Sequence, residues 1–344
     1  MSPAKPPETP QRPMNVLWLQ SGGCGGCSMS LLNADAVDFP GLLAAVGVRW
    51  LSHPALSLGE GAGLLALLAD CIAGRERLDL LVLEGAVLRG PQGSGGFHRL
   101  AGSERPMSDW LRELAGAATH VAAVGSCAAW GGMSAAAPNV TEACGLQFEN
   151  DQPGGLLGTG FRARGGLPVI NIAGCPTHPG WVLDTFGALA SGRLQAEDLD
   201  ALGRPRFYAD HLVHHGCTRN EYYEFKASAA QPSELGCLME HLGCKGTQAH
   251  ADCNIRLWNG MGSCTRGGFA CVSCTEPGFQ DPGHAFDRTP KLAGIPIGLP
   301  TDMPKAWFVA LASLSKSATP RRVKVNAGSD HVALPPAIRK TRLR

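Results

Sequence analysis

Twelve residues with metal-binding side chains, eleven of the thirteen cysteines and one histidine, fall into three groups of four along this chain. The groups are Cys24, Cys27, Cys127 and Cys175; His214, Cys217, Cys237 and Cys244; and Cys253, Cys264, Cys271 and Cys274. Thiolates are soft ligands that favour iron–sulfur clusters, zinc or copper(I), so spacing alone leaves iron and zinc in competition. The simplest interpretation is a protein that holds three iron–sulfur clusters and conducts electrons.

Parts of this pattern have alternative explanations. The spacing Cys271-x-x-Cys274 is also that of a zinc clip. His214 is a weaker candidate ligand, because His215 beside it is a rival and a lone histidine in a loop is usually not a ligand. A single isolated cysteine is more often a buried structural thiol than a metal ligand.

Composition indicates an ordinary globular protein. The 344 residues, 44% of them hydrophobic, are enough for a sizeable core and for two domains. The net charge of +1 gives no electrostatic reason to expect nucleic acid or a membrane surface as a partner. In a long, Gly-rich chain without a signal peptide, the cysteines favour metal ligation over disulfides. We assign the two remaining cysteines, Cys71 and Cys144, to structural or free thiols.

The N-terminus and the apolar stretches bear on the cellular location of the protein. Residues 1–13 are Pro-rich and contain one arginine, Arg12, but no twin-arginine pair. The apolar stretches at 64–69 and 306–314 are too short to span a bilayer. We therefore expect a flexible N-terminus, no membrane anchor and a cytoplasmic location.

Apolar runs alternate with helical patterns in the first half of the chain. The predicted strands are residues 15–19, 78–83, 120–124 and 168–172. The predicted helices lie near residues 31–46, 63–73, 108–118 and 181–190. This alternation predicts a flavodoxin-like α/β domain at residues 14–202, built on a doubly wound parallel sheet.

The first group of cysteines follows the predicted strands. Cys24 with Cys27, Cys127 and Cys175 each lie in a Gly-rich loop directly after a strand, and Glu84 follows another. Open α/β sheets bind ligands at the carboxyl ends of their strands, so these residues are expected to converge there. The glycines would let backbone N–H groups approach inorganic sulfides. Four converging cysteines favour a cluster over four structural thiols.

The pattern changes beyond residues 203–205. A cysteine-rich segment with short helices and long loops follows, and we expect an iron–sulfur domain at 203–318 that holds the second and third groups. Residues 319–344 are expected to form a basic C-terminal tail with a single acid, Asp330. The alternative is a solvated, disordered tail. Its basic residues are Arg321, Arg322, Lys324, Arg339, Lys340, Arg342 and Arg344.

The motifs around the cysteines occur in a fixed order. They include Cys24-Gly-Gly-Cys27-Ser, Leu83-Glu-Gly-Ala-Val, Gly125-Ser-Cys-Ala-Ala-Trp-Gly-Gly, Gly174-Cys-Pro-Thr-His-Pro, His214-x-x-Cys217, Leu242-Gly-Cys-Lys-Gly and Cys271-Val-Ser-Cys-Thr-Glu-Pro-Gly-Phe. Over most of its length the chain resembles the small subunit of [NiFe]-hydrogenases. The order and number of these motifs make an accidental similarity improbable.

The resemblance implies how the clusters are held. A proximal cluster would be bound by Cys24, Cys27, Cys127 and Cys175, a medial cluster by Cys253, Cys264, Cys271 and Cys274, and a distal cluster by His214, Cys217, Cys237 and Cys244. The catalytic nickel–iron centre would lie in a separate large subunit, with which this chain forms a heterodimer or a dimer of heterodimers. This chain would then relay electrons from H2 oxidation and contain no catalytic residue of its own.

Departures from commoner members of the family refine this expectation. Many members have a proline where this chain has Cys264, so Cys264 implies a four-iron medial cluster. Oxygen-tolerant members carry two extra cysteines where this chain has Gly26 and Gly132, so a conventional proximal cubane is expected. We therefore expect three [4Fe–4S] clusters. Six residues separate Cys237 from Cys244, one more than is usual in the family.

Cys264 and the N-terminus make the chain most similar to cytoplasmic hydrogen-sensing, or regulatory, hydrogenases. Members of that group signal to a histidine kinase, and deletion of residues 319–344 is expected to weaken that association. One alternative is the small subunit of a cytoplasmic catalytic (uptake) hydrogenase that feeds a soluble acceptor. A remote alternative is a zinc-stabilised structural protein.

Overall fold

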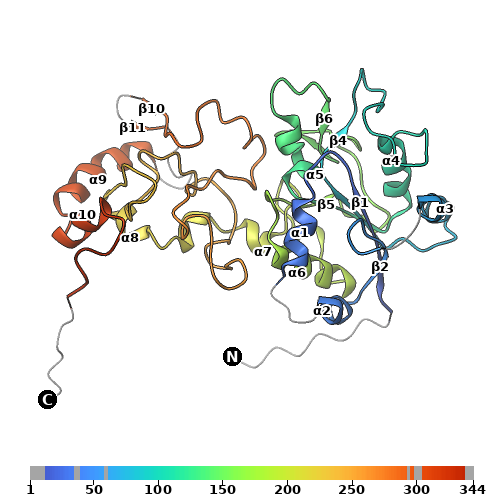
Figure 1. Ribbon diagram of the computed structural model, residues 1–344, viewed down its shortest axis with the longest axis horizontal. Helices are drawn as coiled ribbons and strands as arrows, with labels where there is room; N and C mark the ends of the chain where they lie inside the picture. Colours follow the sequence, from blue (N-terminus) through green and yellow to red (C-terminus); the bar gives the residue numbers. More distant parts are fainter. Residues whose placement is uncertain (1–11, 35–38, 58–60, 293–294, 298–303, 338–344) are drawn as a thin grey trace, which may run out of the picture. The chain divides into compact units, whose positions relative to one another are not determined.

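The structure, a computed structural model, describes residues 12–34, 39–57, 61–292, 295–297 and 304–337 (Figure 1). The chain forms two units. The first unit consists of Met1–Asp210 and Cys274–Asp281, and the second consists of His211–Ser273 and Pro282–Arg344. The chain therefore returns to the first unit for a short segment before it completes the second.

A five-stranded parallel sheet forms the centre of the first unit. Its strand order is β2-β1-β3-β5-β9, and every neighbouring pair is parallel. The strands are β1 (Met14–Gln20), β2 (Val48–Ser52), β3 (Leu80–Glu84), β5 (His120–Val124) and β9 (Ile170–Ile172). The inner strands are covered on both faces, which explains their continuous apolar runs. The predicted α/β class with a parallel central sheet is confirmed.

One strand of this five-stranded sheet, β2, is absent from the sequence-based prediction. It lies at the edge of the sheet, beside β1, and the register of this pair shifts between Val16 and Leu17 of β1. Arg49 is exposed and interrupts the apolar residues of this strand. A half-exposed edge strand lacks the uninterrupted apolar run by which the other strands are recognised.

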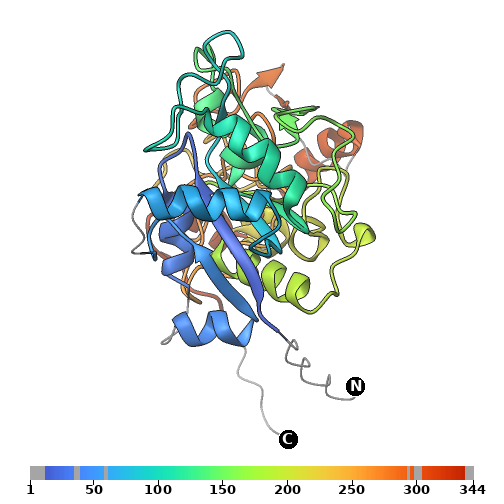
Figure 2. The ribbon, with the colours of Figure 1, turned by 90° about the vertical axis from the view of Figure 1, so that its right-hand side faces the viewer.

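Helices cover both faces of the sheet. The helices α1 (Gly26–Leu32) and α6 (Pro179–Ala190) lie together on one face, and α3 (Gly61–Ile72) and α4 (Met107–Ala117) lie on the other (Figures 1 and 2). The single helix expected near residues 31–46 is instead two, α1 and α2 (Phe39–Ala45), and residues 35–38 lie outside the described part. The helix α1 begins at Gly26, five residues before the predicted start, so its first turn includes Cys27 of the cysteine loop.

The remaining elements are short except for α9, which has 13 residues. They are β4 (Val87–Leu88), β6 (Ala143–Cys144), β7 (Phe148–Glu149), β8 (Gln152–Pro153), β10 (Lys291–Leu292), β11 (Ile295–Pro296), α5 (Ser126–Trp130), α7 (Arg206–Ala209), α8 (Asn220–Glu224), α9 (Lys305–Ser317), α10 (Arg321–Ala327), and the 3₁₀ turns η1 (Gly132–Ala135), η2 (Ala196–Asp198) and η3 (Val213–Gly216). The second unit contains few regular elements and consists mainly of loops. Among the described residues, no helix has both the length and the apolar character needed to cross a membrane.

The first unit extends to Asp210, beyond the boundary expected at residue 202. Tyr208 is fully buried, and its hydroxyl donates to the carbonyl of Asn171 on β9 (3.0 Å). Arg204 is also buried and forms ion pairs with Asp200 (2.8 Å) and Glu276 (2.9 Å). These contacts tie the segment after residue 202 to the sheet.

The returning segment Cys274–Asp281 is fastened by polar contacts within the first unit. The hydroxyl of Ser126 donates to the carbonyl oxygen of Cys274, and the indole of Trp130 donates to the carbonyl oxygen of Thr275 (3.3 Å). Gln280 donates to the side chain of Asn150 (2.8 Å). Partners so distant along the chain are not visible in a sequence pattern.

The two cysteines outside the three groups are buried in the first unit. Cys71 lies in α3 and Cys144 in β6, and both belong to the main hydrophobic core. Burial raises the pKa of each thiol to about 11. Both therefore stay protonated near neutral pH.

We expect a buried histidine to make the first unit sensitive to acid. The His53 ring lies between Trp18 and Trp50, with ring centroids 4.9 and 5.1 Å away, and its Nδ1 accepts from the Ala55 N–H. Burial lowers its pKa from 6.5 to about 4. Because the folded pKa lies below the unfolded value, the stabilisation is complete above pH 6.5 and is lost as the pH falls towards 4, by about 3 kcal/mol.

Thermal denaturation of the purified complex at pH 7 and at pH 4.5 measures this loss. The variant His53→Asn retains an acceptor near the position of Nδ1 but does not titrate, so its melting temperature should change less between these pH values. An equal change in melting temperature in both proteins would show that His53 is not the cause of the acid sensitivity.

Candidate functional site

The first group of cysteines converges at the carboxyl ends of the strands. Cys24 and Cys175 are exposed, Cys127 is half-buried and Cys27 is buried. Burial raises the pKa values of Cys27, Cys127 and Cys175, and repulsion from neighbouring thiols adds to this shift. The interacting thiols include all four members of the group. The structure thus brings together residues that lie far apart in the sequence.

Two glycines bring the backbone close to these sulfurs. A Cβ atom added to Gly125 would lie 2.5 Å from the sulfur of Cys27, and one added to Gly132 would lie 2.9 Å from the sulfur of Cys127. Both glycines have positive φ angles, 88° and 49°, which side chains rarely adopt. The Gly132 position therefore leaves no room for an additional cysteine unless the backbone of Cys127 moves.

A buried carboxylate organises the Cys24–Cys27 loop. One oxygen of Glu84, at the end of β3, accepts from the backbone N–H groups of Cys27 (2.9 Å) and Ser28 (3.0 Å). The other accepts from the indole of Trp18 (3.1 Å), the amide of Gln20 (2.9 Å) and the Ser28 hydroxyl (2.5 Å). Glu84 is only 3% exposed, and these five bonds compensate for the burial of its charge.

The second group surrounds a small cavity in the second unit. His214, Cys217, Cys237 and Cys244 all line it, together with Tyr223 and other residues. The backbone N–H of Arg219 donates to the sulfur of Cys217, and that of Cys271 donates to the sulfur of Cys244, both at 3.4 Å. Burial raises the pKa of Cys237 to about 12. A metal cation that binds such a thiol replaces its proton.

His214 and its rival His215 have different surroundings. His214 lines the cavity, and its ring packs edge-on against Tyr223 at a centroid distance of 4.2 Å. The Nδ1 atom of His215 instead accepts from the backbone N–H of Leu212 (3.4 Å) within the turn η3. The structure favours His214 as the fourth member of this group.

A buried arginine joins the loops that carry the cysteines. Arg219 donates through Nη1 to the carbonyl oxygens of Glu234 (2.7 Å) and Gly236 (2.6 Å), and through Nε to that of Thr265 (3.0 Å). It is 9% exposed. Sequence analysis did not identify it, because arginine is usually exposed and nothing in the local pattern signals its burial.

The third group is divided between the two units. Cys253, Cys264 and Cys271 belong to the second unit, and Cys274 belongs to the first. Asn254, next to Cys253, accepts from the hydroxyls of Ser263 (2.5 Å) and Thr265 (2.9 Å), the two neighbours of Cys264. These bonds hold the loops of Cys253 and Cys264 together.

The donor set and the backbone fit iron–sulfur clusters. Among the described residues, no three His, Cys, Asp or Glu side chains are close enough to share one metal ion. The four ligands of a [4Fe–4S] cluster bind different iron atoms, so a cluster does not require its ligands to meet at one point. Thiolates at the sheet edge and in the cavity, with close backbone N–H groups, suit such a group.

Two family models match the chain. The family described as "NADH ubiquinone oxidoreductase, 20 Kd subunit" matches residues 24–189. The family that describes the C-terminal part of the NiFe/NiFeSe hydrogenase small subunit matches residues 209–287. The two matches correspond closely to the α/β part and to the cysteine-rich part of the chain.

Curated relatives are hydrogenase small subunits. The F420 non-reducing hydrogenase I small subunit of Methanosarcina mazei is 38% identical over 291 residues, which cover 77% of this chain and 73% of that protein. The periplasmic [NiFeSe] hydrogenase small subunit of Desulfomicrobium baculatum is 32% identical over 288 residues, covering 79% and 86%.

Solved structures agree with this similarity. The Ni-Fe-Se hydrogenase of Desulfomicrobium baculatum, in a reduced, active form, matches with a TM-score of 0.69 and 30% identity, covering 80% of this chain and 99% of that chain. The actinobacterial-type NiFe-hydrogenase of Ralstonia eutropha H16 matches with a TM-score of 0.73 and 26% identity, covering 92% and 94%. This chain therefore belongs to the [NiFe]-hydrogenase small-subunit family, whose members carry iron–sulfur clusters, transfer electrons and pair with a large subunit that holds the catalytic site.

Proposed function

We propose that this chain is the electron-transfer small subunit of a hydrogen-sensing [NiFe]-hydrogenase and that it holds three [4Fe–4S] clusters. The proposed ligands are Cys24, Cys27, Cys127 and Cys175 for the proximal cluster, Cys253, Cys264, Cys271 and Cys274 for the medial cluster, and His214, Cys217, Cys237 and Cys244 for the distal cluster. The convergence of the first group at the sheet edge and of the second group around one cavity supports this assignment.

The chain's own residues shape these sites. When bound, the clusters supply a series of one-electron sites that lead away from the catalytic centre of the large subunit. Glu84 holds the Cys24–Cys27 loop in place through its five hydrogen bonds. Arg219 holds the loops around Cys237. Rigid ligand loops keep the distances between redox sites constant.

The ligand set of the second group differs in charge from the first. His214 contributes a neutral imidazole, where each cysteine contributes a negative thiolate. A less negative ligand set favours the reduced state, as mixed His/Cys ligation does in other iron–sulfur proteins. This difference suits the site from which electrons leave the chain.

Anaerobic affinity purification of the chain from its native host tests the main proposal. We expect to recover a large subunit, nickel and iron, and broad visible absorption from iron–sulfur clusters. A colourless preparation that contains zinc and no nickel partner would contradict the proposal and favour a structural protein.

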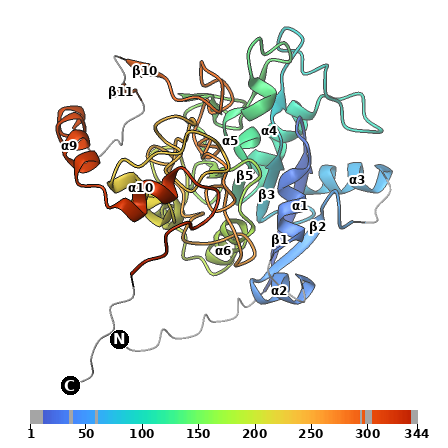
Figure 3. The ribbon, with the colours of Figure 1, turned by 60° about the vertical axis from the view of Figure 1, so that its left-hand side comes forward.

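The sensing role is supported by the basic C-terminal segment. Within it, α10 lies beside α8 in the second unit (Figure 3). Val323 and Asn326 are buried, and Asn326 exchanges two hydrogen bonds with the backbone of Leu334 (2.8 and 2.9 Å). Arg321 and Lys324 are exposed. An ordered surface with exposed cations suits recognition of an acidic protein surface, here that of a histidine kinase.

The basic residues Arg339, Lys340, Arg342 and Arg344 lie outside the described part.

Complete deletion of residues 319–344 would do more than remove this charge. The backbone N–H groups of Leu235 and Gly236, next to Cys237, donate to the carbonyls of Ser329 (2.8 Å) and Ala327 (3.0 Å). The deletion would remove these partners and disturb the Cys237 loop. A charge reversal on the exposed face is therefore the sharper experiment.

We predict that the double variant Arg321→Glu, Lys324→Glu binds the kinase at least about tenfold more weakly while H2-dependent dye reduction stays unchanged. Pull-down of the kinase with the purified heterodimer measures the binding. The double variant Arg162→Glu, Arg164→Glu makes the same charge change at exposed positions of the first unit and serves as a control. Undiminished kinase binding by the α10 variant would contradict the proposal that the basic face of α10 binds the kinase.

A second candidate is the small subunit of a cytoplasmic catalytic hydrogenase that feeds a soluble acceptor. The 38% identity to the F420 non-reducing hydrogenase I small subunit favours the catalytic role in this candidate. The partners recovered in the purification distinguish the two. A histidine kinase supports sensing, whereas a soluble reductase supports the catalytic role.

A further inference from the structure

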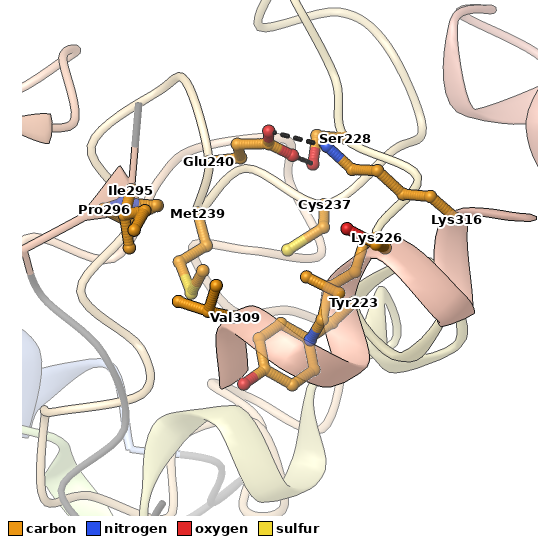
Figure 4. Close-up of a pocket in the computed structure, with 12 residues that line it drawn as sticks. Tyr223, Lys226, Ser228, Cys237, Met239, Glu240, Ile295, Pro296, Val309 and Lys316 are labelled. Atoms are coloured by element: carbon orange, nitrogen blue, oxygen red, sulfur yellow. Dashed lines mark hydrogen bonds and ion pairs between the residues drawn. The ribbon is translucent and has the colours of Figure 1, made fainter. Parts of the chain in front are cut away.

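A second cavity lies beside the one that the second group of cysteines surrounds. It has a volume of about 190 Å³ and lies between the Cys237 loop and α9 (Figure 4). Its apolar wall includes Met239, Val309 and Ala312. Figure 4 shows the sulfur of Cys237 pointing into the space between Tyr223, Met239 and Val309.

The two cavities share part of their walls. Tyr223, Cys237 and Met239 line both of them. An occupant of the second cavity would therefore be separated from the proposed distal cluster by little more than the Cys237 side chain. A molecule bound in this cavity is therefore close enough to Cys237 to accept an electron that leaves the chain there.

Charged groups lie at the polar side of this cavity. The ammonium of Lys316 donates to one oxygen of Glu240 (3.0 Å), and the hydroxyl of Ser228 donates to the other (2.6 Å). The Lys226 ammonium lies over the Tyr223 ring, 3.8 Å from its centroid. Two lysines and one glutamate give the cavity a net positive charge, which stabilises the negative charge that an occupant carries after it gains an electron and before it gains a proton.

The size of the cavity limits the occupant. A cavity of about 150 Å³ holds a benzene ring, so one of about 190 Å³ holds one substituted ring or two small fused rings. The three fused rings of a flavin exceed this volume. An apolar ring with carbonyl groups that accept hydrogen bonds from ammonium groups matches the lining.

We propose that this cavity binds the ring of a quinone, which accepts the electrons that leave the chain through Cys237. The proposal rests on the proposed electron-transfer function and adds the chemical class of the acceptor. Oxidation of one H2 releases two electrons and two protons. Two electrons, passed one at a time, and two protons from the solvent convert the two quinone carbonyls into hydroxyls.

Two alanines on α9 provide a matched pair of variants. Ala312 lines the cavity, and Ala310 is exposed. Ala312→Trp places an indole in the cavity, whereas Ala310→Trp adds the same side chain to the same helix at an exposed position. Lys226→Met is a third variant, which removes the ammonium and retains an unbranched chain.

Equilibrium dialysis of the oxidised heterodimer against ubiquinone-1 measures the binding without relying on turnover. We expect the Kd to rise at least about tenfold in Ala312→Trp, to rise about threefold or more in Lys226→Met, and to change less than about twofold in Ala310→Trp. Menadione, with two fused rings, should bind at the same site, and flavin mononucleotide should not.

The iron content of the same samples separates this proposal from the function on which it rests. Full iron with no ubiquinone-1 binding, or with equal binding by the two tryptophan variants, overturns the quinone site and leaves the electron-transfer function standing. Flavin mononucleotide bound more tightly than either quinone also overturns it. A chain without iron overturns the electron-transfer function, and the quinone site with it.

Discussion

Replacement of Glu84 by methionine lowers the free energy of unfolding of the first unit by about 5 kcal/mol and prevents retention of the proximal cluster. Methionine fills a similar volume but accepts none of the five hydrogen bonds. The N–H groups of Cys27, Ser28 and Trp18 would be left buried without an acceptor. Each unsatisfied buried donor costs about 1–3 kcal/mol. Thermal denaturation and iron analysis of the purified heterodimer measure both effects.

The variant Glu84→Gln is the informative comparison. Its amide oxygen can still accept from the two backbone N–H groups, and the side chains of Gln20 and Ser28 can rotate to accept from its NH2 group. The Trp18 indole, which can only donate, loses its acceptor, so we expect a loss of about 1–3 kcal/mol, with iron retained. Glu104→Met serves as a surface control, because the Glu104 side chain is 95% exposed. Equal destabilisation by Glu84→Met and Glu104→Met would refute the role assigned to this carboxylate.

Replacement of Cys264 by proline converts the medial cluster towards a three-iron form. The chain then contains about one iron atom less, because a missing cysteine leaves one iron without a protein ligand. Electron paramagnetic resonance of the oxidised protein should show a new signal from the three-iron cluster, and iron analysis should show the lost atom. An unchanged four-iron signal would refute the ligand role of Cys264.

Two further variants separate ligation from folding. Cys264→Ser removes the thiol but retains an ordinary backbone, so it should also change the medial cluster if ligation is the cause. Cys71→Ser alters a cysteine that is buried in the hydrophobic core of the first unit. It should lower stability and leave the number of iron atoms unchanged. The loops beside Cys264 should persist in Cys264→Ser, because Asn254 fastens its two neighbours.

Sequence patterns were most informative where burial is uniform. The strands β1, β3, β5 and β9 lie where continuous apolar runs predict them. The edge strand β2 was missed because its exposed Arg49 interrupts the run. Helix α1 was placed too late because its start depends on Glu84, which is distant in sequence. Local periodicity carries no information about such a partner.

The cysteine spacing and the neighbouring motifs identified the family, which the comparisons confirm. The proposed ligands of the first and second groups also follow from the sequence, because a strand end or a short Cys motif marks most of them. The roles of Arg219 and Tyr223 do not follow. Arg219 bonds to three backbone carbonyls on separate loops, and Tyr223 lines both cavities. Both roles depend on loops that come together only in the folded chain.

The sequence alone therefore determined the parallel sheet and the family and supplied the proposed metal ligands, since residue type, spacing and periodicity encode these locally. Tertiary structure decided the extension of the first unit to Asp210, the return of Cys274–Asp281 to it, and the cavity beside Cys237. Each of these depends on contacts between residues far apart in the chain, such as Tyr208 with Asn171 and Lys316 with Glu240. Such pairings arise from how the whole chain packs.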